Sequence, residues 1–219
     1  MSTYDKDAVL AKIGTTGLLP LFNFADFEIC AAVIKACYAA GIRAFELTNR
    51  DEKAFEVFKK LVPFVKNELP ELTLGAGTIL DVVTAQKFID AGADYIIAPN
   101  LDFGVGEVCL KNNIPWIPGC MTPSEFQQAY KFGSPLIKLF PGSILGPDYL
   151  KHILAPLPHL RVVVTGGVQN TAESINSWLK SGAFACGIGS QLFSKEIIQK
   201  KNFDEITVQL NKLIAGISR

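Results

Sequence analysis

The sequence is poor in several residue types on which whole classes of function depend. Basic and acidic side chains number 21 each, and no stretch concentrates lysine and arginine, so nucleic acid is not an expected partner. Only two histidines occur, and the five cysteines form no CxxC pair. We therefore expect no metal site, and the scattered, odd-numbered thiols are typical of a reduced protein in the cytoplasm.

Long apolar runs are missing as well. No run is long enough to span a membrane, and residues 1–12 mix charged with apolar side chains, without the apolar core of a signal peptide. No G-x-G-x-x-G turn follows the first predicted strand, and there is no P-loop lysine motif. We therefore expect neither membrane association nor binding of a nucleoside triphosphate. Because the chain is 49% hydrophobic and 19% charged, it can build a sizeable core.

Short apolar runs that alternate with helical patterns are abundant. The runs predict eight strands, at residues 18–24, 44–48, 72–78, 95–99, 114–119, 136–140, 160–165 and 184–189. The intervening patterns predict helices at residues 5–13, 27–40, 51–67, 81–91, 103–111, from 122 onward, 146–154, 170–181 and 204–215.

Parallel strands that are buried on both faces appear in a sequence as continuous apolar runs. Eight strand–helix units in 219 residues therefore predict an α/β fold, a single (β/α)8 TIM barrel over residues 1–219, with an extra N-terminal helix. A doubly wound open sheet is the alternative, although it usually has fewer such units.

Two ionisable side chains interrupt the predicted strands. Lys138 lies in the middle of the apolar segment 135–142, and Glu46 lies between Phe45 and Leu47. A buried, unpaired ammonium either finds a carboxylate or loses its proton, and a neutral lysine is a nucleophile that forms Schiff bases with carbonyls. Two plainer alternatives are a half-exposed, ion-paired lysine and a buried Lys138–Glu46 pair that only neutralises itself.

The other candidates follow predicted strands, where the active sites of TIM barrels lie. Arg50, the only one of four arginines at a strand exit, could hold a carboxylate together with Thr78. Pro99 and Phe140 would supply an apolar wall, although plain packing or capping explains these residues and Thr78 as well. Two glycine-rich exits offer backbone N–H groups to a phosphate, and they comprise Thr165, Gly166, Gly167, Gly189 and Ser190.

Seven motifs, taken jointly and in order, resemble those of one known family. They lie at residues 45–50, 75–78, 97–99, 117–119, 137–141, 165–167 and 189–190, and the similarity extends from residue 18 to residue 190. The family is that of the pyruvate-dependent class I aldolases, which includes 2-keto-3-deoxy-6-phosphogluconate (KDPG) aldolase and 4-hydroxy-2-oxoglutarate (KHG) aldolase.

The resemblance implies a carbon–carbon lyase that cleaves KDPG to pyruvate and glyceraldehyde 3-phosphate, and that could also cleave KHG to pyruvate and glyoxylate. It implies that Lys138 forms the Schiff base and that Glu46 is the acid/base, acting through a water. It assigns Arg50 and Thr78 to the pyruvate carboxylate and Pro99 and Phe140 to the pyruvyl group. It assigns the far-end phosphate to Thr165, Gly166, Gly167, Gly189 and Ser190.

The resemblance also implies a homotrimer with no metal and no organic cofactor. Asn49 and Leu139 differ from the residues common in the family, next to matched positions, which bears on substrate preference more than on chemistry. Two other functions remain open at this point. One is a phosphate-binding barrel with isomerase or thiamine-phosphate-synthase-like transferase activity. The other is a non-catalytic sugar-acid-binding barrel that keeps Lys138 as an anion anchor.

Overall fold

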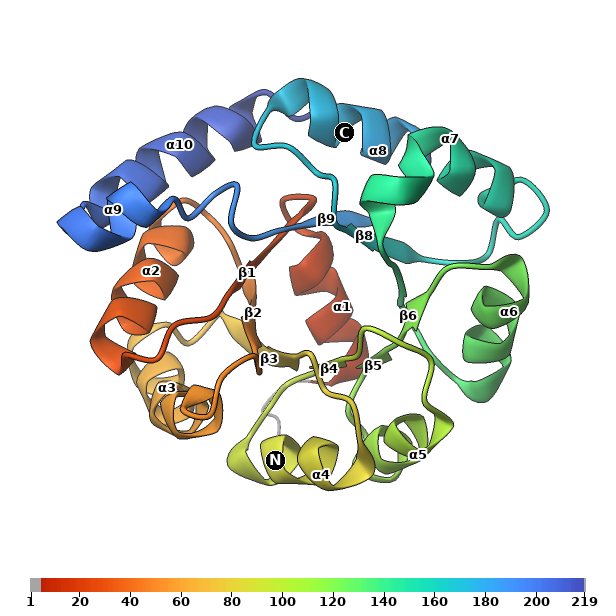
Figure 1. Ribbon diagram of the computed structural model, residues 1–219, viewed down its shortest axis with the longest axis horizontal. Coiled ribbons are helices and arrows are strands. Elements are labelled where there is room, and N and C mark those ends of the chain that lie inside the picture. Colours follow the sequence, from red (N-terminus) through yellow and green to blue (C-terminus); the bar gives the residue numbers. More distant parts are fainter. Residues whose placement is uncertain (1–4, 219) are drawn as a thin grey trace.

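The computed structural model describes residues 5–218 and confirms a barrel of parallel strands surrounded by helices (Figure 1). The strands lie side by side in the order β5-β4-β3-β2-β1-β9-β8-β7-β6, and every recorded pairing is parallel. Their bounds are β1 (Leu18–Phe22), β2 (Ala44–Thr48), β3 (Thr73–Gly77), β4 (Ile96–Ile97), β5 (Trp116–Ile117), β6 (Gly119–Cys120), β7 (Ile137–Leu139), β8 (Val162–Thr165) and β9 (Ala185–Ile188).

The fifth predicted strand is divided into two short strands, β5 and β6, by Pro118. Proline has no N–H to donate, so it interrupts a strand ladder. β5 pairs with β4 and β6 pairs with β7, while the Lys138 N–H donates to the Pro118 carbonyl at 2.8 Å. This one segment therefore joins the two edges of the sheet and closes the barrel.

The helices follow the predicted positions with two differences. α7 begins four residues before the predicted start and bends at Gly146 (φ +76°), and the six-residue α9 after β9 was not predicted. The helices are α1 (Lys6–Gly14), α2 (Phe27–Ala39), α3 (Ala54–Glu68), α4 (Val82–Ala91), α5 (Phe103–Lys111), α6 (Pro123–Phe132), α7 (Gly142–Leu154), α8 (Ala172–Lys180), α9 (Lys195–Lys200) and α10 (Phe203–Ala215).

The strands separate two apolar cores. The larger core fills the space between the strands and the surrounding helices, and on β2 it receives Phe45 and Leu47. The smaller core lies inside the barrel, where Val9, Leu10 and Ile13 of α1 pack on residues near the strand starts, such as Ala44. α1, the predicted extra helix, therefore closes the N-terminal end of the barrel (Figure 1), and the C-terminal end stays free for a site.

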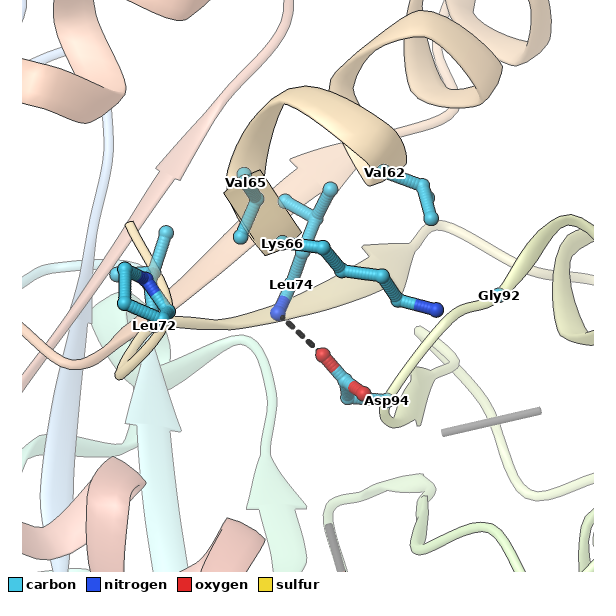
Figure 2. Close-up of a pocket in the computed structure, with 8 residues that line it drawn as sticks. Val62, Val65, Lys66, Leu72, Leu74, Gly92 and Asp94 are labelled. Atoms are coloured by element: carbon cyan, nitrogen blue, oxygen red, sulfur yellow. Dashed lines mark hydrogen bonds between the residues drawn. The ribbon is translucent and has the colours of Figure 1, made fainter. Parts of the chain in front are cut away.

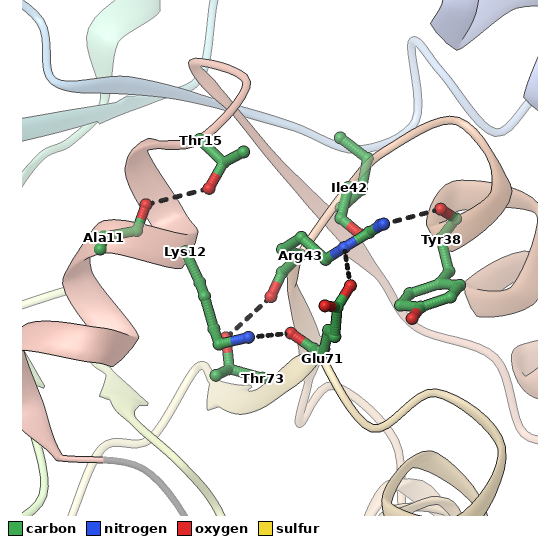
Figure 3. A network of polar contacts seen from close by, with 8 residues as sticks. All are labelled: Ala11, Lys12, Thr15, Tyr38, Ile42, Arg43, Glu71 and Thr73. Atoms are coloured by element: carbon green, nitrogen blue, oxygen red, sulfur yellow. Dashed lines mark hydrogen bonds and ion pairs between the residues drawn. The ribbon is translucent and has the colours of Figure 1, made fainter.

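A polar network holds α1 against the starts of β2 and β3 (Figure 3). The Arg43 guanidinium pairs with Glu71 at 3.1 Å, donates to the Tyr38 carbonyl at 3.0 Å and stacks on the Tyr38 ring at 4.2 Å. Lys12 of α1 donates to the Glu71 carbonyl, and the Thr73 hydroxyl donates to the Arg43 carbonyl at 3.1 Å. The network lies at the N-terminal end of the barrel, which is consistent with a structural role.

Arg43→Ala is expected to lower the free energy of unfolding by about 1–2 kcal/mol, because it removes several hydrogen bonds and a stacked side chain. Urea denaturation measures the effect, and kcat should not change. Lys111→Ala is the control, since Lys111 forms an exposed 2.8 Å pair with Glu107 within α5 and should change stability by much less than Arg43→Ala. A loss of activity in Arg43→Ala would contradict a purely structural role.

No helix among residues 5–218 is both long enough and apolar enough to cross a membrane. The organisation of residues 1–219 as a single domain remains a prediction, and it includes residues 1–4 and 219, which lie outside the described range.

Candidate active site

A cavity of about 920 Å³ opens at the C-terminal end of the barrel. Residues at or just after the ends of β1, β2, β7, β8 and β9 line it, together with part of α9. Seven of the predicted site residues lie in this lining: Arg50, Phe140, Thr165, Gly166, Gly167, Gly189 and Ser190. Residues that are far apart in the chain therefore meet at one mouth, as expected for the exits of parallel strands.

Lys138 and Glu46 lie deeper in the barrel, with 4% and 1% of their surfaces exposed. β2 and β7 lie on opposite sides of the barrel. Three strands separate them in either direction when β5 and β6 are counted as one. Glu46 and Lys138 each occupy an inward-facing position of their strand, so both side chains point into the interior of the barrel. Neither group forms an ion pair with any residue that the structure describes. The close, self-neutralising pair considered from the sequence is therefore not formed.

Burial decides the protonation preferences of the two groups. Desolvation raises the pKa of Glu46 above its ordinary range, and the nearby positive charges of Lys138 and Arg50 only partly oppose this. Desolvation also lowers the pKa of Lys138. The carboxylate of Glu46 opposes the shift, and the charge of Arg50 adds to it. Both effects favour the neutral forms, which are an amine able to attack a carbonyl and a carboxylic acid able to donate a proton.

Glycines on the inward face of β3 provide the space that these side chains occupy. A Cβ at Gly77 would lie 1.7 Å from Oε1 of Glu46, and a Cβ at Gly75 would lie 2.0 Å from Cε2 of Tyr95. No side chain fits at either position unless its neighbour moves. The motif at residues 75–78 therefore shapes the floor of the site, which is a more specific role than the open space expected from the sequence.

Gly77→Ala is expected to lower kcat by about 10²-fold, because the new methyl group must displace the Glu46 carboxylate by 1 Å or more. Steady-state kinetics measure the loss. In the Glu46→Gln background the same change should cost little further activity, since both variants act through one carboxylate. Independent losses that add in the double variant would contradict this explanation.

Thr78 and Pro99 follow β3 and β4 at the same end of the barrel, but they do not belong to the lining of the large cavity. Thr78 has a φ of +60°, a left-handed conformation that is rare for a β-branched residue and costs about 1–3 kcal/mol. Such strain often marks functional positions. The Pro99 carbonyl packs so closely on Gly119 that a Cβ there would lie 2.2 Å away.

The two consecutive glycines after β8 are required by the backbone. Gly166 and Gly167 have φ values of +90° and +77°, which side chains rarely adopt. A Cβ at Gly167 would lie 2.5 Å from Cα of Ser143, so this exit loop sits tightly on the first turn of α7. Directly after β9, a Cβ at Gly189 would lie 2.7 Å from Leu21. Backbone N–H groups can approach a ligand closely along these exits.

Several lining residues were not identified from the sequence. They are Asn23 and Phe24 after β1, Gln169 after β8, Gln191 after β9, and Lys195 at the start of α9. The Asn23 side-chain oxygen is buried and has no hydrogen-bond partner among residues 5–218. Asn23 and Phe24 fell inside the predicted strand 18–24, so only Gln169 and Gln191 carried a signal, which was their position after a predicted strand. Lys195 had none, because its helix was not predicted.

A smaller cavity of about 370 Å³ lies at the other end of the barrel (Figure 2). Its polar groups are Lys66 and Asp94, and the Asp94 carboxylate accepts a hydrogen bond from the Leu74 N–H at 2.9 Å. None of the predicted site residues lines it. The described residues also contain no cluster of three or more His, Cys, Asp or Glu side chains that could hold a metal ion.

Comparison with known proteins identifies the family. The family model described as KDPG and KHG aldolase matches residues 9–209. The chain belongs to the KDPG and KHG aldolase family. It is 31% identical over 193 residues to 2-dehydro-3-deoxy-phosphogluconate aldolase of Treponema pallidum, which covers 87% of this chain and 88% of that protein. It is 28% identical over 207 residues to KHG/KDPG aldolase of Escherichia coli, which covers 94% of each chain.

A solved structure supports the same family assignment. KDPG aldolase from Legionella pneumophila, with pyruvate captured at low pH as a covalent carbinolamine intermediate, superposes with a TM-score of 0.84 at 25% identity. The match covers 93% of this chain and 97% of that one. The KDPG and KHG aldolase family accounts for the fold and for carbon–carbon lyase activity. It therefore decides against the isomerase, transferase and non-catalytic alternatives.

Proposed function

We propose that this protein is a metal-independent class I aldolase that cleaves KDPG to pyruvate and glyceraldehyde 3-phosphate, with KHG as a second substrate. The observation that carries the proposal is the buried Lys138, whose pKa burial lowers, on the side of the barrel opposite a buried carboxyl group. The relatives from T. pallidum and E. coli bear the names of these activities. The L. pneumophila enzyme was captured with pyruvate bound covalently.

The first half of the proposed reaction forms the electron sink. The neutral amine of Lys138 attacks the C2 carbonyl of the 2-keto acid, and the carbonyl oxygen takes a proton from Glu46 through a water. Loss of water from the carbinolamine leaves an iminium ion between Lys138 and C2. Arg50 and Thr78 hold the adjacent carboxylate, and Phe140 and Pro99 cover the pyruvyl group. The Phe140 ring centroid lies 4.8 Å from Nζ of Lys138.

The second half breaks the carbon–carbon bond. Glu46, now ionised, takes the proton of the C4 hydroxyl through the water, the C3–C4 bond breaks, and its electron pair neutralises the iminium to give an enamine. The aldehyde leaves with its phosphate, which Thr165, Ser190 and the exit glycines hold during binding. Protonation of the enamine at C3 and hydrolysis of the resulting iminium release pyruvate and restore the amine.

Borohydride trapping tests the mechanism. The protein is incubated with pyruvate and sodium borohydride, digested, and its peptides are weighed. A reduced pyruvate adduct on Lys138 is expected, and the absence of a stable adduct would overturn the Schiff-base assignment.

A panel of phosphorylated and unphosphorylated 2-keto-4-hydroxy acids, assayed for pyruvate release, tests the substrate. Full activity after exhaustive treatment with a chelator would support metal independence, and loss that a divalent cation restores would contradict it.

We further propose a homotrimer in the cytoplasm. An exposed apolar patch supports assembly: it comprises Leu80, Val82, Val83 and Phe103, at the starts of α4 and α5. Exposed apolar patches often mark contacts between protein chains. All five cysteines are free and buried, which is consistent with a reducing compartment.

Val83→Lys is expected to dissociate the trimer, because it places a charge on the most exposed residue of the patch, at 77%. Analytical ultracentrifugation should show the mass falling from about three times to one times 23.8 kDa. Val208→Lys is the matched control, since Val208 is 61% exposed on α10, at a distance from α4 (Figure 1). Equal masses for both variants and the unmodified protein would show that this patch does not hold the trimer.

A further inference from the structure

Tyr95, the residue just before β4, lies inside the barrel and is not assigned a role by the mechanism above. Its side chain is fully buried in the inner core, next to residues that α1 covers. Its hydroxyl has no hydrogen bond of ordinary geometry to any of residues 5–218, although the backbone of Gly75 and Phe45 approaches it. Buried hydroxyls are seldom left without a partner, so this group calls for an explanation.

The position of Tyr95 relative to β3 supplies one. Its ring covers Gly75, and the Glu46 carboxylate covers Gly77, the next inward position of the same strand. Two inward positions of a strand are about 7 Å apart. Gly75 also pairs directly with Glu46 in the strand register. The Tyr95 ring and the Glu46 carboxylate therefore lie over neighbouring inward positions of one strand, and the charge of Glu46 acts on the Tyr95 hydroxyl.

Both oxygens of Glu46 are also buried without a hydrogen-bond partner among the described residues. The Tyr95 hydroxyl, the Glu46 carboxyl group and the nearby ammonium or amine of Lys138 together provide the two to four polar partners that a buried water molecule needs. The Glu46 oxygens have no protein partner. The N–H groups of Gly75 and Phe45 face the Tyr95 oxygen and leave its O–H without an acceptor, so one water would complete the hydrogen bonding of both residues.

We propose that Tyr95 is a positioning residue whose hydroxyl, together with Glu46, holds the water through which protons move to and from the substrate. The inference rests on the proposed function and extends it to a group at the floor of the site. The hydroxyl donates to the water, and the water donates to the carboxylate. This arrangement favours the ionised form of Glu46 after it has given up its proton.

Charges around the two groups set the expected direction of a pH effect. Glu46 of β2 and Asp94, which precedes β4, act on Tyr95, and burial raises the pKa of Tyr95 well above its ordinary value, so the hydroxyl keeps its proton. Lys138 and Arg50 act on Glu46. Loss of the Tyr95 hydroxyl removes a stabilising contact from the Glu46 carboxylate, which raises its pKa further.

Tyr95→Phe tests the proposal, with Thr73→Val as the matched control. Thr73→Val removes another fully buried hydroxyl from the inward face of β3, at the end of the strand away from Glu46. In Tyr95→Phe, kcat should fall about tenfold while KM stays within about twofold. The Glu46 limb of the pH profile of kcat/KM should move to higher pH, and borohydride should still trap pyruvate on Lys138. Thr73→Val should keep the unmodified pH profile.

An unchanged kcat and pH profile in Tyr95→Phe would overturn the proposal. Equal losses in Tyr95→Phe and Thr73→Val, with unchanged pH profiles, would do the same, because they would show only general loosening. A high-resolution crystal structure of the unmodified protein after pyruvate trapping gives a second measurement, and the absence of a water between Tyr95 and Glu46 would also overturn the proposal. An unmodified protein that neither traps pyruvate nor cleaves KDPG would instead refute the proposed function.

Discussion

Replacing Lys138 with methionine is expected to lower kcat/KM for KDPG cleavage by about 10⁴-fold or more and to abolish trapping of pyruvate by borohydride. Methionine fills a similar space in the apolar strand but has no amine to form the iminium ion. The protein should fold normally, and its stability should not fall at neutral pH. The lowered pKa of Lys138 means that any protonated amine is held in the barrel at a cost, and methionine removes that cost.

The sign of this stability effect follows from linkage. A lysine whose pKa is depressed in the folded state contributes its full stability only above its unfolded pKa, and that stability is lost as the pH falls through the folded value. Lys138→Met should therefore remove the decrease in stability that occurs as the pH falls from the ordinary lysine pKa of 10.5 to the lowered folded value. The midpoint of urea unfolding, measured across the pH range, checks this expectation.

Two controls isolate the amine. Lys66→Met removes an exposed lysine beside the small cavity at the opposite end of the barrel, and it should leave activity and trapping unchanged. Lys138→Arg keeps a positive charge but has no free amine, so it should be as inactive as Lys138→Met. Substantial activity in Lys138→Arg would contradict the Schiff-base mechanism and would indicate that Lys138 serves as an anion anchor.

Glu46→Gln is expected to lower turnover by about 10²-fold or more while the fold stays intact. Glutamine has the shape of the carboxyl group but cannot exchange protons with the water. Exchange of the pyruvate methyl protons with deuterated solvent, followed by NMR, should slow by a similar factor, because it uses the same proton transfer without bond cleavage. Near-normal exchange would remove Glu46 from the mechanism.

Glu46→Gln should also be at least as stable as the unmodified protein at neutral pH. Burial raises the pKa of Glu46, so the stability that its neutral form provides is lost as the pH rises through the folded pKa. Glutamine does not ionise and avoids that loss. The Glu46 carboxylate opposes the effect of burial on Lys138. The substitution removes that negative charge, so it should lower the pKa of Lys138 further. A clear decrease in the urea midpoint at pH 7 would contradict this account.

Local patterns predicted most of the strands and helices because burial on both faces of a parallel sheet leaves a direct trace in the chain. Val162–Thr165 and Ala185–Ile188 are strands because they are buried and almost entirely apolar, and turn residues bound them. α6 begins directly after Thr122, which caps it. The Thr122 side chain accepts a hydrogen bond from the Glu125 N–H, and the Glu125 side chain accepts one from the Thr122 N–H, as in a capping box. By contrast, α9 is only six residues long and lies close to α10, so its periodicity was too short to separate.

Local patterns in the sequence were enough to place Lys138 and Glu46 within apolar strands and Arg50 at a strand exit, because each of these positions depends on immediate neighbours in the chain. Tertiary structure alone decided that Glu46 and Lys138 lie on opposite sides of one interior without forming an ion pair, and that Tyr95 lies beside Glu46 over the glycines of β3. It also decided that Pro118 divides the closing strand. These facts depend on strand order and register, which closure of the barrel sets and no local pattern records.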